Sequence, residues 1–131
     1  MKAAAIGDVV GVTLYRKVWM SLGADHGFYI TSPLPPVHYY RKAFLIDLLF
    51  HKPVIGIELQ AEPWTPQPFY HLPLTEQKKT MDLAQFQKNV QYAEDTGFDQ
   101  FYFWGAEWWY WLKTKHQNPE IWNEAKKLFV N

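Results

Sequence analysis

Acidic residues stand at or just beyond the ends of apolar segments in this sequence. Glu58 closes the apolar run at residues 54–57, and Glu62 follows at the start of an irregular, proline-rich stretch. Glu107 comes shortly after another apolar run, at residues 101–104. Carboxyl groups can act as nucleophiles, as proton donors or as acceptors for hydroxyl groups. The structural alternatives are a salt-bridged glutamate at position 58 and an acidic residue in the first turn of a helix at position 107.

Aromatic residues crowd into the same places. They make up 18% of the chain, including seven Trp, and this content fits either a core of large side chains or a sugar-binding cleft. In such a cleft, flat rings stack on the apolar faces of pyranose rings. The rings beside the apolar segment ends favour the cleft: Tyr15, Trp19, Trp64, Trp104, Trp108, Trp109, Tyr110 and Trp111.

Three segments predict the strands that would position these residues, at about residues 8–15, 53–59 and 99–104. The first two are rich in β-branched residues and nearly all apolar, as expected for strands buried on both faces of a parallel sheet. Each strand precedes a helical pattern, and this alternation predicts an α/β fold with parallel strands and right-handed crossovers. The carboxyl ends of parallel strands meet at one edge, so the candidate residues should gather there.

The helical patterns predict which faces are buried. A helix should begin near Pro36, because proline suits the first helical turn, and its apolar face consists of Val37, Tyr40, Phe44, Leu45, Leu48 and Leu49. Asp82 and Gln85 form a capping-box pattern for the next helix. That helix should bury Leu83, Phe86, Val90 and Ala93 and end at Gly97.

The remaining segments are shorter. Residues 28–31 predict a short extra strand, residues 75–80 predict one helical turn, and residues 107–116 predict a helix. Asn118 is expected to cap a final helix with Pro119 at its first position. Its inward-facing residues should be Ile121, Trp122, Ala125, Leu128 and Phe129.

The strand segments resemble a known family. Lys52-Pro53, an apolar run and then Glu58 resemble the seventh-strand motif of the clan of retaining glycoside hydrolases that contains β-glucosidases and endo-cellulases. Residues 8–15, which run from Asp8 to Tyr15, look like the sixth strand of that clan, and residues 101–104 are similar to its eighth strand. The resemblance implies that Glu58 is the catalytic nucleophile, that Tyr15 hydrogen-bonds it, and that Trp104 floors the sugar site.

The resemblance covers roughly residues 8–110. It implies that residues 1–131 form a single domain, the C-terminal portion of a TIM (β/α)8 barrel with about three parallel β-α units. The implied function is a C-terminal fragment of a retaining β-glycoside hydrolase. Trp64, Glu62, Glu107 and Arg16 are then expected at the substrate-binding mouth, although a structural ion pair is the favoured role for Arg16.

The sequence departs from the family pattern in two ways. Leu59-Gln60-Ala61-Glu62 follows the candidate nucleophile, so Glu62 is a second candidate for that role, which we weight below Glu58. The general acid/base of the family is a Glu in an Asn-Glu-Pro motif on the fourth strand, and this sequence has no such motif. We therefore expect the isolated chain to be inactive. The alternatives are a non-catalytic carbohydrate-binding module and an interaction module that completes a barrel.

Composition argues against several other classes. Thirteen basic residues balance thirteen acidic ones, whereas nucleic acids and anionic membranes need a basic surface. The five histidines form no metal-binding pattern, and no P-loop or GxSxG motif occurs, so we expect neither metal nor cofactor. The N-terminal apolar run is too short for a signal peptide and no run is long enough for a membrane helix. The chain is expected to be soluble, in a compartment that the sequence does not identify.

Two further expectations concern architecture and association. A small open α/β sheet is the main alternative fold, but it would normally carry a glycine-rich loop after its first strand. Here Tyr15-Arg16-Lys17 follows instead. A carbohydrate is the expected substrate. Because the outer strands of a partial barrel expose open edges, the chain is expected to associate with itself or with the missing part of the barrel.

Overall fold

The computed structural model describes residues 2–23 and 26–129. The strands are β1 (Val10–Leu14), β2 (Lys17–Gly23), β3 (His26–Thr31), β4 (Val54–Gln60) and β5 (Phe101–Trp104). The helices are α1 (Lys2–Ile6), α2 (Pro36–Phe50), α3 (Leu74–Gln77), α4 (Leu83–Glu94), α5 (Ala106–Lys115) and α6 (Glu120–Lys127), and a 3-10 turn, η1, spans Phe69–His71.

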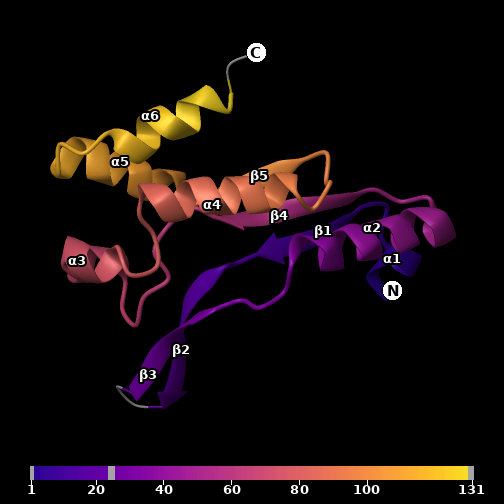
Figure 1. The fold of residues 1–131 in the computed structure, drawn as a ribbon, viewed down its shortest axis with the longest axis horizontal. Coiled ribbons are helices and arrows are strands. Elements are labelled where there is room, and N and C mark those ends of the chain that lie inside the picture. The colour runs from indigo at the N-terminus through magenta and orange to yellow at the C-terminus, as the bar shows by residue number, and fades with distance from the viewer. Residues whose placement is uncertain (1, 24–25, 130–131) are drawn as a thin grey trace.

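The fold is α/β, built on a three-stranded parallel sheet in the order β1-β4-β5 (Figure 1). Leu14 pairs with Leu59, and Gln60 pairs with Trp104. The three predicted strands and their parallel orientation are therefore confirmed. Because all three strands run the same way, their carboxyl ends lie at one edge of the sheet.

Strand β4 contains an irregularity just before Glu58. Val12 of β1 pairs with Gly56, but the next residue, Thr13, pairs with Glu58, so Ile57 is an extra residue on β4. Bulges of this kind re-aim the side chains that follow them. A Cβ atom at Gly11 would lie 2.8 Å from the Ile57 side chain, so Gly11 makes room for the bulged residue.

Helices cover one face of the sheet. Leu14 and Leu59 are 1% exposed and pack against Tyr92 and Ala93 of α4. The largest core continues beneath α5 and α6 and contains Ala61, Met81, Phe86, Trp108, Trp109, Leu112, Ile121 and Ala125. On the opposite face, Ile57, Tyr102 and Trp104 are 45–52% exposed. The sheet is therefore packed on one side and open on the other.

Helix α2 forms at the predicted residues, but its predicted buried face is exposed. It buries Ile46, which packs with Val10 and Ala4. The six residues of the predicted apolar face are 44–59% exposed: Val37, Tyr40, Phe44, Leu45, Leu48 and Leu49. The prediction was wrong in this respect, because α2 has few packing partners among the described elements. Leu128 and Phe129, predicted to face inward, are also exposed.

A β-hairpin follows β1 and projects away from the sheet (Figure 1). The sequence predicted only the second of its two strands. In the structure, β2 and β3 pair antiparallel, with Trp19 opposite Tyr29. The sequence predicts a loop at residues 17–23, where the structure has β2.

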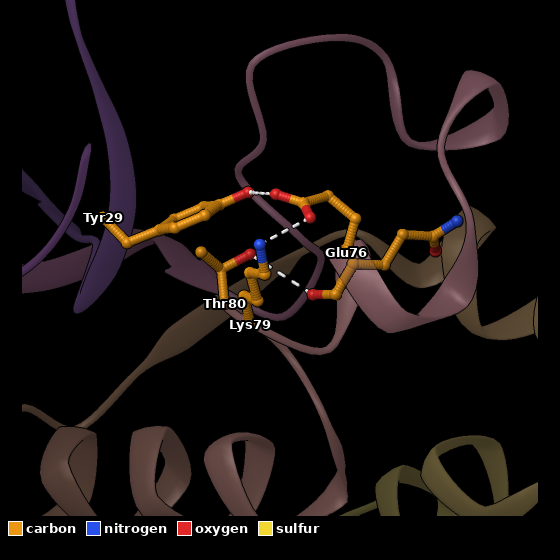
Figure 2. Close-up of polar contacts among 5 residues, drawn as sticks. Tyr29, Glu76, Lys79 and Thr80 are labelled. Atoms are coloured by element: carbon orange, nitrogen blue, oxygen red, sulfur yellow. Dashed lines mark hydrogen bonds and ion pairs between the residues drawn. The ribbon is translucent and has the colours of Figure 1, made fainter. Parts of the chain in front are cut away.

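The hairpin is joined to α3 by a polar cluster, shown in Figure 2. The Tyr29 hydroxyl donates a hydrogen bond to the Glu76 carboxylate, whose other oxygen pairs with the Lys79 ammonium at 2.7 Å. The Lys79 ammonium also lies 5.6 Å from the centre of the Tyr29 ring. These contacts fix the hairpin beside the segment that follows β4.

The remaining helix boundaries lie close to their predicted positions. The Asp82 side chain caps α4 by accepting from the Gln85 backbone N–H at 2.7 Å, as predicted, although the Gln85 amide bonds Asn89 rather than returning to Asp82. Helix α6 begins at Glu120, and Asn118 accepts a bond from its N–H. No helix within residues 2–23 and 26–129 is long and apolar enough to cross a membrane.

Candidate active site

The structure brings Tyr15, Glu58 and Trp104 to one edge of the sheet. Tyr15 directly follows β1, Glu58 lies near the end of β4, and Trp104 is the last residue of β5. The Glu58 carboxylate is close enough to the Tyr15 hydroxyl to raise its pKa. The convergence of these residues therefore follows from the parallel order of the strands and the bulge at Ile57.

The environment of Tyr15 keeps its hydroxyl protonated. Burial raises the pKa of Tyr15 well above its ordinary value of 10.0, and the charge and hydrogen bond of Glu58 raise it further, with a smaller contribution from the charge of Glu62. A phenol with a raised pKa remains a hydrogen-bond donor at neutral pH. Tyr15 can thus orient the Glu58 carboxylate without carrying a competing charge.

Glu62 lies at the same mouth and contacts Trp104. The indole N–H of Trp104 donates a hydrogen bond to the Glu62 carboxylate at 3.0 Å. Burial raises the pKa of Glu62, and the negative charge of Glu107 raises it further, whereas the Trp104 bond acts in the opposite direction. Glu62 therefore holds its proton to a higher pH than an ordinary glutamate, and Glu107 is close enough to influence it.

The ends of β4 and β5 approach each other closely at Gly105. A Cβ atom at this position would lie 2.4 Å from the Cβ of Glu62 and 2.8 Å from its backbone nitrogen. Gly105 also has φ of 120°, a conformation that other residues rarely adopt. Only glycine allows this approach, which places Glu62 against the indole of Trp104.

Trp64 extends the site beyond the strand ends. Its ring meets the Tyr15 ring edge-on, with centroids 5.0 Å apart, and it is 44% exposed. It borders an open hollow of about 310 Å³ formed by residues 62–69. An exposed indole beside the carboxylates is suited to stacking on a flat apolar ligand surface.

Arg16 points elsewhere. Its guanidinium donates to the backbone carbonyls of Ser32 and Leu34, each at 3.0 Å, and lies 3.9 Å from the centre of the Tyr92 ring. Neither the predicted contact with substrate nor the alternative ion pair describes these interactions. Instead, Arg16 anchors the loop that connects the hairpin to α2.

Sequence reasoning missed Gln60, which is fully buried at the centre of the site. Its side chain bonds the backbone of Arg16 and Lys17, directly after Tyr15. The signal was present as a polar residue inside an apolar strand, between the two candidate carboxylates Glu58 and Glu62.

Two other concave regions do not include Tyr15, Glu58, Glu62 or Trp104. A cavity of about 190 Å³ lies between α3, α4, α5 and α6, with Trp108 and Gln77 in its wall. A larger groove, of about 440 Å³, lies between α2 and the segment that leads into β5. Within residues 2–23 and 26–129, no group of His, Asp or Glu side chains is arranged to hold a metal ion.

The comparisons with known proteins add no family assignment. No protein-family model matches the chain, and neither the search of curated proteins nor the search of solved structures returned a match.

Proposed function

We propose that this chain is the C-terminal portion, strands six to eight, of a retaining β-glycoside hydrolase barrel, with Glu58 as its nucleophile. The observation that carries the proposal is that Tyr15, Glu58 and Trp104 stand at the ends of three parallel strands, where the charge of Glu58 acts on the Tyr15 phenol. This arrangement supports the roles that the sequence motifs imply for all three residues. A strand-end glutamate with only a structural role would not need a phenol donor and an exposed indole beside it.

In the proposed reaction the Glu58 carboxylate attacks the anomeric carbon of a sugar. Tyr15 orients the carboxylate through its hydroxyl, and the indoles of Trp104 and Trp64 stack on the sugar faces. Retaining hydrolysis also needs a second carboxyl group about 5–5.5 Å from the first, which protonates the leaving oxygen. In the family this group belongs to the fourth strand, which precedes the segment resembled here.

The open surfaces of the fold support a larger barrel. Among the described strands, β1 and β5 each have a partner on one side only. The sheet face that carries Ile57, Tyr102 and Trp104 is about half-exposed, and a closed barrel fills this face with side chains. Strands added at both edges would satisfy the free backbone groups and cover this face together.

The roles of Glu58 and Glu62 differ in this proposal. Glu58 is the carboxylate that acts on the Tyr15 phenol, and a neighbouring hydroxyl donor suits a nucleophile that must be held in one orientation. Glu62, with its raised pKa and its bond to Trp104, suits a group that binds a sugar hydroxyl. Glu107, exposed in the first turn of α5, lies close enough to assist it.

Covalent trapping tests the nucleophile assignment. Dinitrophenyl 2-deoxy-2-fluoroglycosides carry a leaving group that departs without protonation, so the absence of an acid does not prevent labelling. We expect a panel of such reagents with different sugars to add one glycosyl group to Glu58, detected by mass spectrometry of peptides. Glu58→Gln should abolish the label and Glu62→Gln should retain it. A label on Glu62, or no label from any reagent, would contradict the assignment.

Turnover of ordinary aryl β-glycosides should remain far below an enzyme-like rate. Loss of a positioned acid typically costs 10²–10⁴-fold, and most contacts that orient the sugar are expected on the missing strands. A stable monomer with Glu58-dependent turnover would contradict this expectation and would mean that another acid, Glu62 or Glu107, completes the site.

The alternative function is a module that binds carbohydrate without catalysis. The exposed indoles of Trp64 and Trp104 favour it, because binding needs these rings but not a nucleophile. Titration of the tryptophan fluorescence with oligosaccharides distinguishes the two functions when combined with trapping. Saccharide binding that Trp104→Ala removes and Glu58→Gln leaves intact, with no covalent label, would favour the binding module.

A further inference from the structure

Gln60 is a fully buried amide at the end of β4 whose side chain bonds the backbone where β1 leads into β2. Its oxygen accepts hydrogen bonds from the backbone N–H groups of Arg16 and Lys17, both at 2.9 Å. Its nitrogen donates to the Lys17 carbonyl at 2.7 Å and lies 3.4 Å from the Glu62 carbonyl. All hydrogen-bonding capacity of the amide is therefore directed at the backbone on either side of the candidate site.

These bonds lie just beyond the last pair of the β1–β4 ladder. The β1–β4 ladder stops at the pair Leu14 and Leu59, and Tyr15 is the next residue. Beyond it, the Gln60 amide supplies the donors and acceptors that a further ladder step would have supplied. The backbone carbonyl of Gln60 in turn accepts from the buried Asn89 amide of α4 at 2.9 Å, so its own position is fixed.

The hydrogen bonds of Gln60 also fix the position of Tyr15. This residue is held on one side by the ladder at Leu14 and on the other by the two N–H groups that Gln60 binds. Glu58 lies two residues before Gln60 on β4, and its carboxylate is close enough to Tyr15 to raise the pKa of the phenol. A shift of residues 16 and 17 away from β4 would carry the phenol away from the carboxylate.

We propose that Gln60 is a positioning residue that holds the Tyr15 hydroxyl against the Glu58 carboxylate and links the β2–β3 hairpin to the site. This inference rests on the proposed function for its catalytic meaning, but the positioning itself is a property of the folded chain. The buried amide of Gln60 then serves the site rather than general stability.

Gln77 provides a matched control. It is equally buried, and its amide donates to the carbonyls of Phe69 and Leu72 and accepts from the Trp108 indole N–H. It therefore has the same residue type, the same burial and a similar number of bonds, but none to the backbone beside Tyr15. Gln60→Met and Gln77→Met remove comparable sets of interactions, and only the first should affect the site.

The test follows the Tyr15 titration by NMR in protein labelled at the tyrosine ring carbon, with Tyr15→Phe to assign the signal. In the parent chain, Tyr15 should titrate above its ordinary pKa of 10.0. Gln60→Met should shift its pKa down toward that value, whereas Gln77→Met should leave it unchanged. In the Glu58→Gln background the effect of Gln60→Met should shrink, because part of it acts through the Glu58 carboxylate.

A Tyr15 titration that Gln60→Met leaves unchanged, or that Gln77→Met shifts equally, would overturn the proposal. If Gln60→Met does not fold, amide hydrogen exchange in the parent chain still decides. Slow exchange at Arg16 and Lys17 is expected for N–H groups bonded to a buried amide, and fast exchange there would overturn the proposal. Labelling of Glu58 is independent, so failed labelling with a shifted Tyr15 titration would refute the proposed function alone.

Discussion

Helices α2 and α4 each lie in a connection between two strands of the parallel sheet (Figure 1), α2 between β1 and β4 and α4 between β4 and β5, yet they differ in how far they are packed. Phe86 of α4 is fully buried, whereas Phe44 of α2 is 57% exposed. Both sequences carry an apolar face at helical spacing. An apolar face in the sequence shows which side chains can be buried. Whether they are buried depends on the neighbouring elements.

The neighbours of the two helices explain the contrast. Helix α4 packs on β4 and beside α6, and its Phe86 contacts the rings of Phe103 and Trp109. Helix α2 contacts the short helix α1 and the start of β4, beside the free edge of β1. We call α2 with the free edge of β1 the open region, and β5 with α4, α5 and α6 the packed region. The candidate site lies where these two regions meet, because Tyr15 follows β1 and Glu62 and Trp104 lie beside the packed helices.

The largest expected effect compares the two phenylalanines directly. Phe86→Ala should lower the free energy of unfolding by about 3–5 kcal/mol, because it leaves a cavity among buried rings. Phe44→Ala should change it by no more than about 0.5 kcal/mol, as for other exposed positions. Urea denaturation of both variants measures the difference. Equal losses of unfolding free energy in the two variants would mean that Phe44 is buried in solution and that α2 packs against another surface of the protein.

The second prediction concerns association through the open region. Lysines at Leu45 and Leu48, which are 46% and 57% exposed, would place charges on the apolar face of α2. If that face mediates self-association, Leu45→Lys with Leu48→Lys should raise the dissociation constant at least about tenfold, equivalent to ~1.4 kcal/mol.

Analytical ultracentrifugation across a concentration series makes this measurement. Asn123→Lys on α6 adds a charge to an exposed position in the packed region and serves as the control. If Asn123→Lys weakened self-association as much as the α2 variant did, the apolar face of α2 would not be the site of association.

A third, smaller effect concerns the start of each helix. Asp82 caps α4 through its side chain, whereas α2 begins after Pro35 with no side-chain cap bond. Asp82→Ala should cost about 1 kcal/mol of stability, and Asp82→Asn should cost much less because Asn also caps well. Thermal denaturation of the two variants checks the difference, and equal losses would mean that the charge of Asp82 matters more than its hydrogen bond.

The sequence predicted elements whose signals are local. The strands at residues 10–14, 54–60 and 101–104 have continuous apolar runs, and Asp82 has a capping pattern, so their positions follow from a few adjacent residues. The gathering of Tyr15, Glu58 and Trp104 at one end of the sheet then follows from the parallel order of the strands, whereas the bulge at Ile57 has no local signal. The exposure of α2 could not be predicted in this way, because it depends on which elements are present to cover it.

The missed features depend on contacts between distant residues. Strand β2 is specified by its pairing with β3, and the hairpin is held by Tyr29 and Glu76, which are far apart in sequence. Gln60 acquires its role only when residues 16 and 17 lie beside β4. The contacts of Arg16 could not be predicted for the same reason, since its carbonyl partners are brought near by the return of the hairpin.

The smallest expected effect is the pH dependence that Glu62 imposes on the packed side of the site. Burial and the charge of Glu107 raise the pKa of Glu62 above its ordinary value of 4.5. Between 4.5 and the raised value, the folded chain keeps a proton that the unfolded chain has released. Stability therefore falls as the pH rises through this window, and the full loss persists at neutral pH.

Glu62→Gln should remove this loss while keeping an oxygen that accepts the Trp104 indole bond. The variant should be more stable than the parent at pH 7 and should lose that advantage below pH 4.5, where the parent is protonated in both states. Glu107→Gln should give a smaller gain, since it removes the second of the two causes and leaves burial in place. Thermal unfolding at a series of pH values measures all three proteins. A Glu62→Gln variant that is no more stable than the parent at neutral pH would mean that Glu62 is well solvated, and the case for a desolvated carboxyl group beside Trp104 would fail with it.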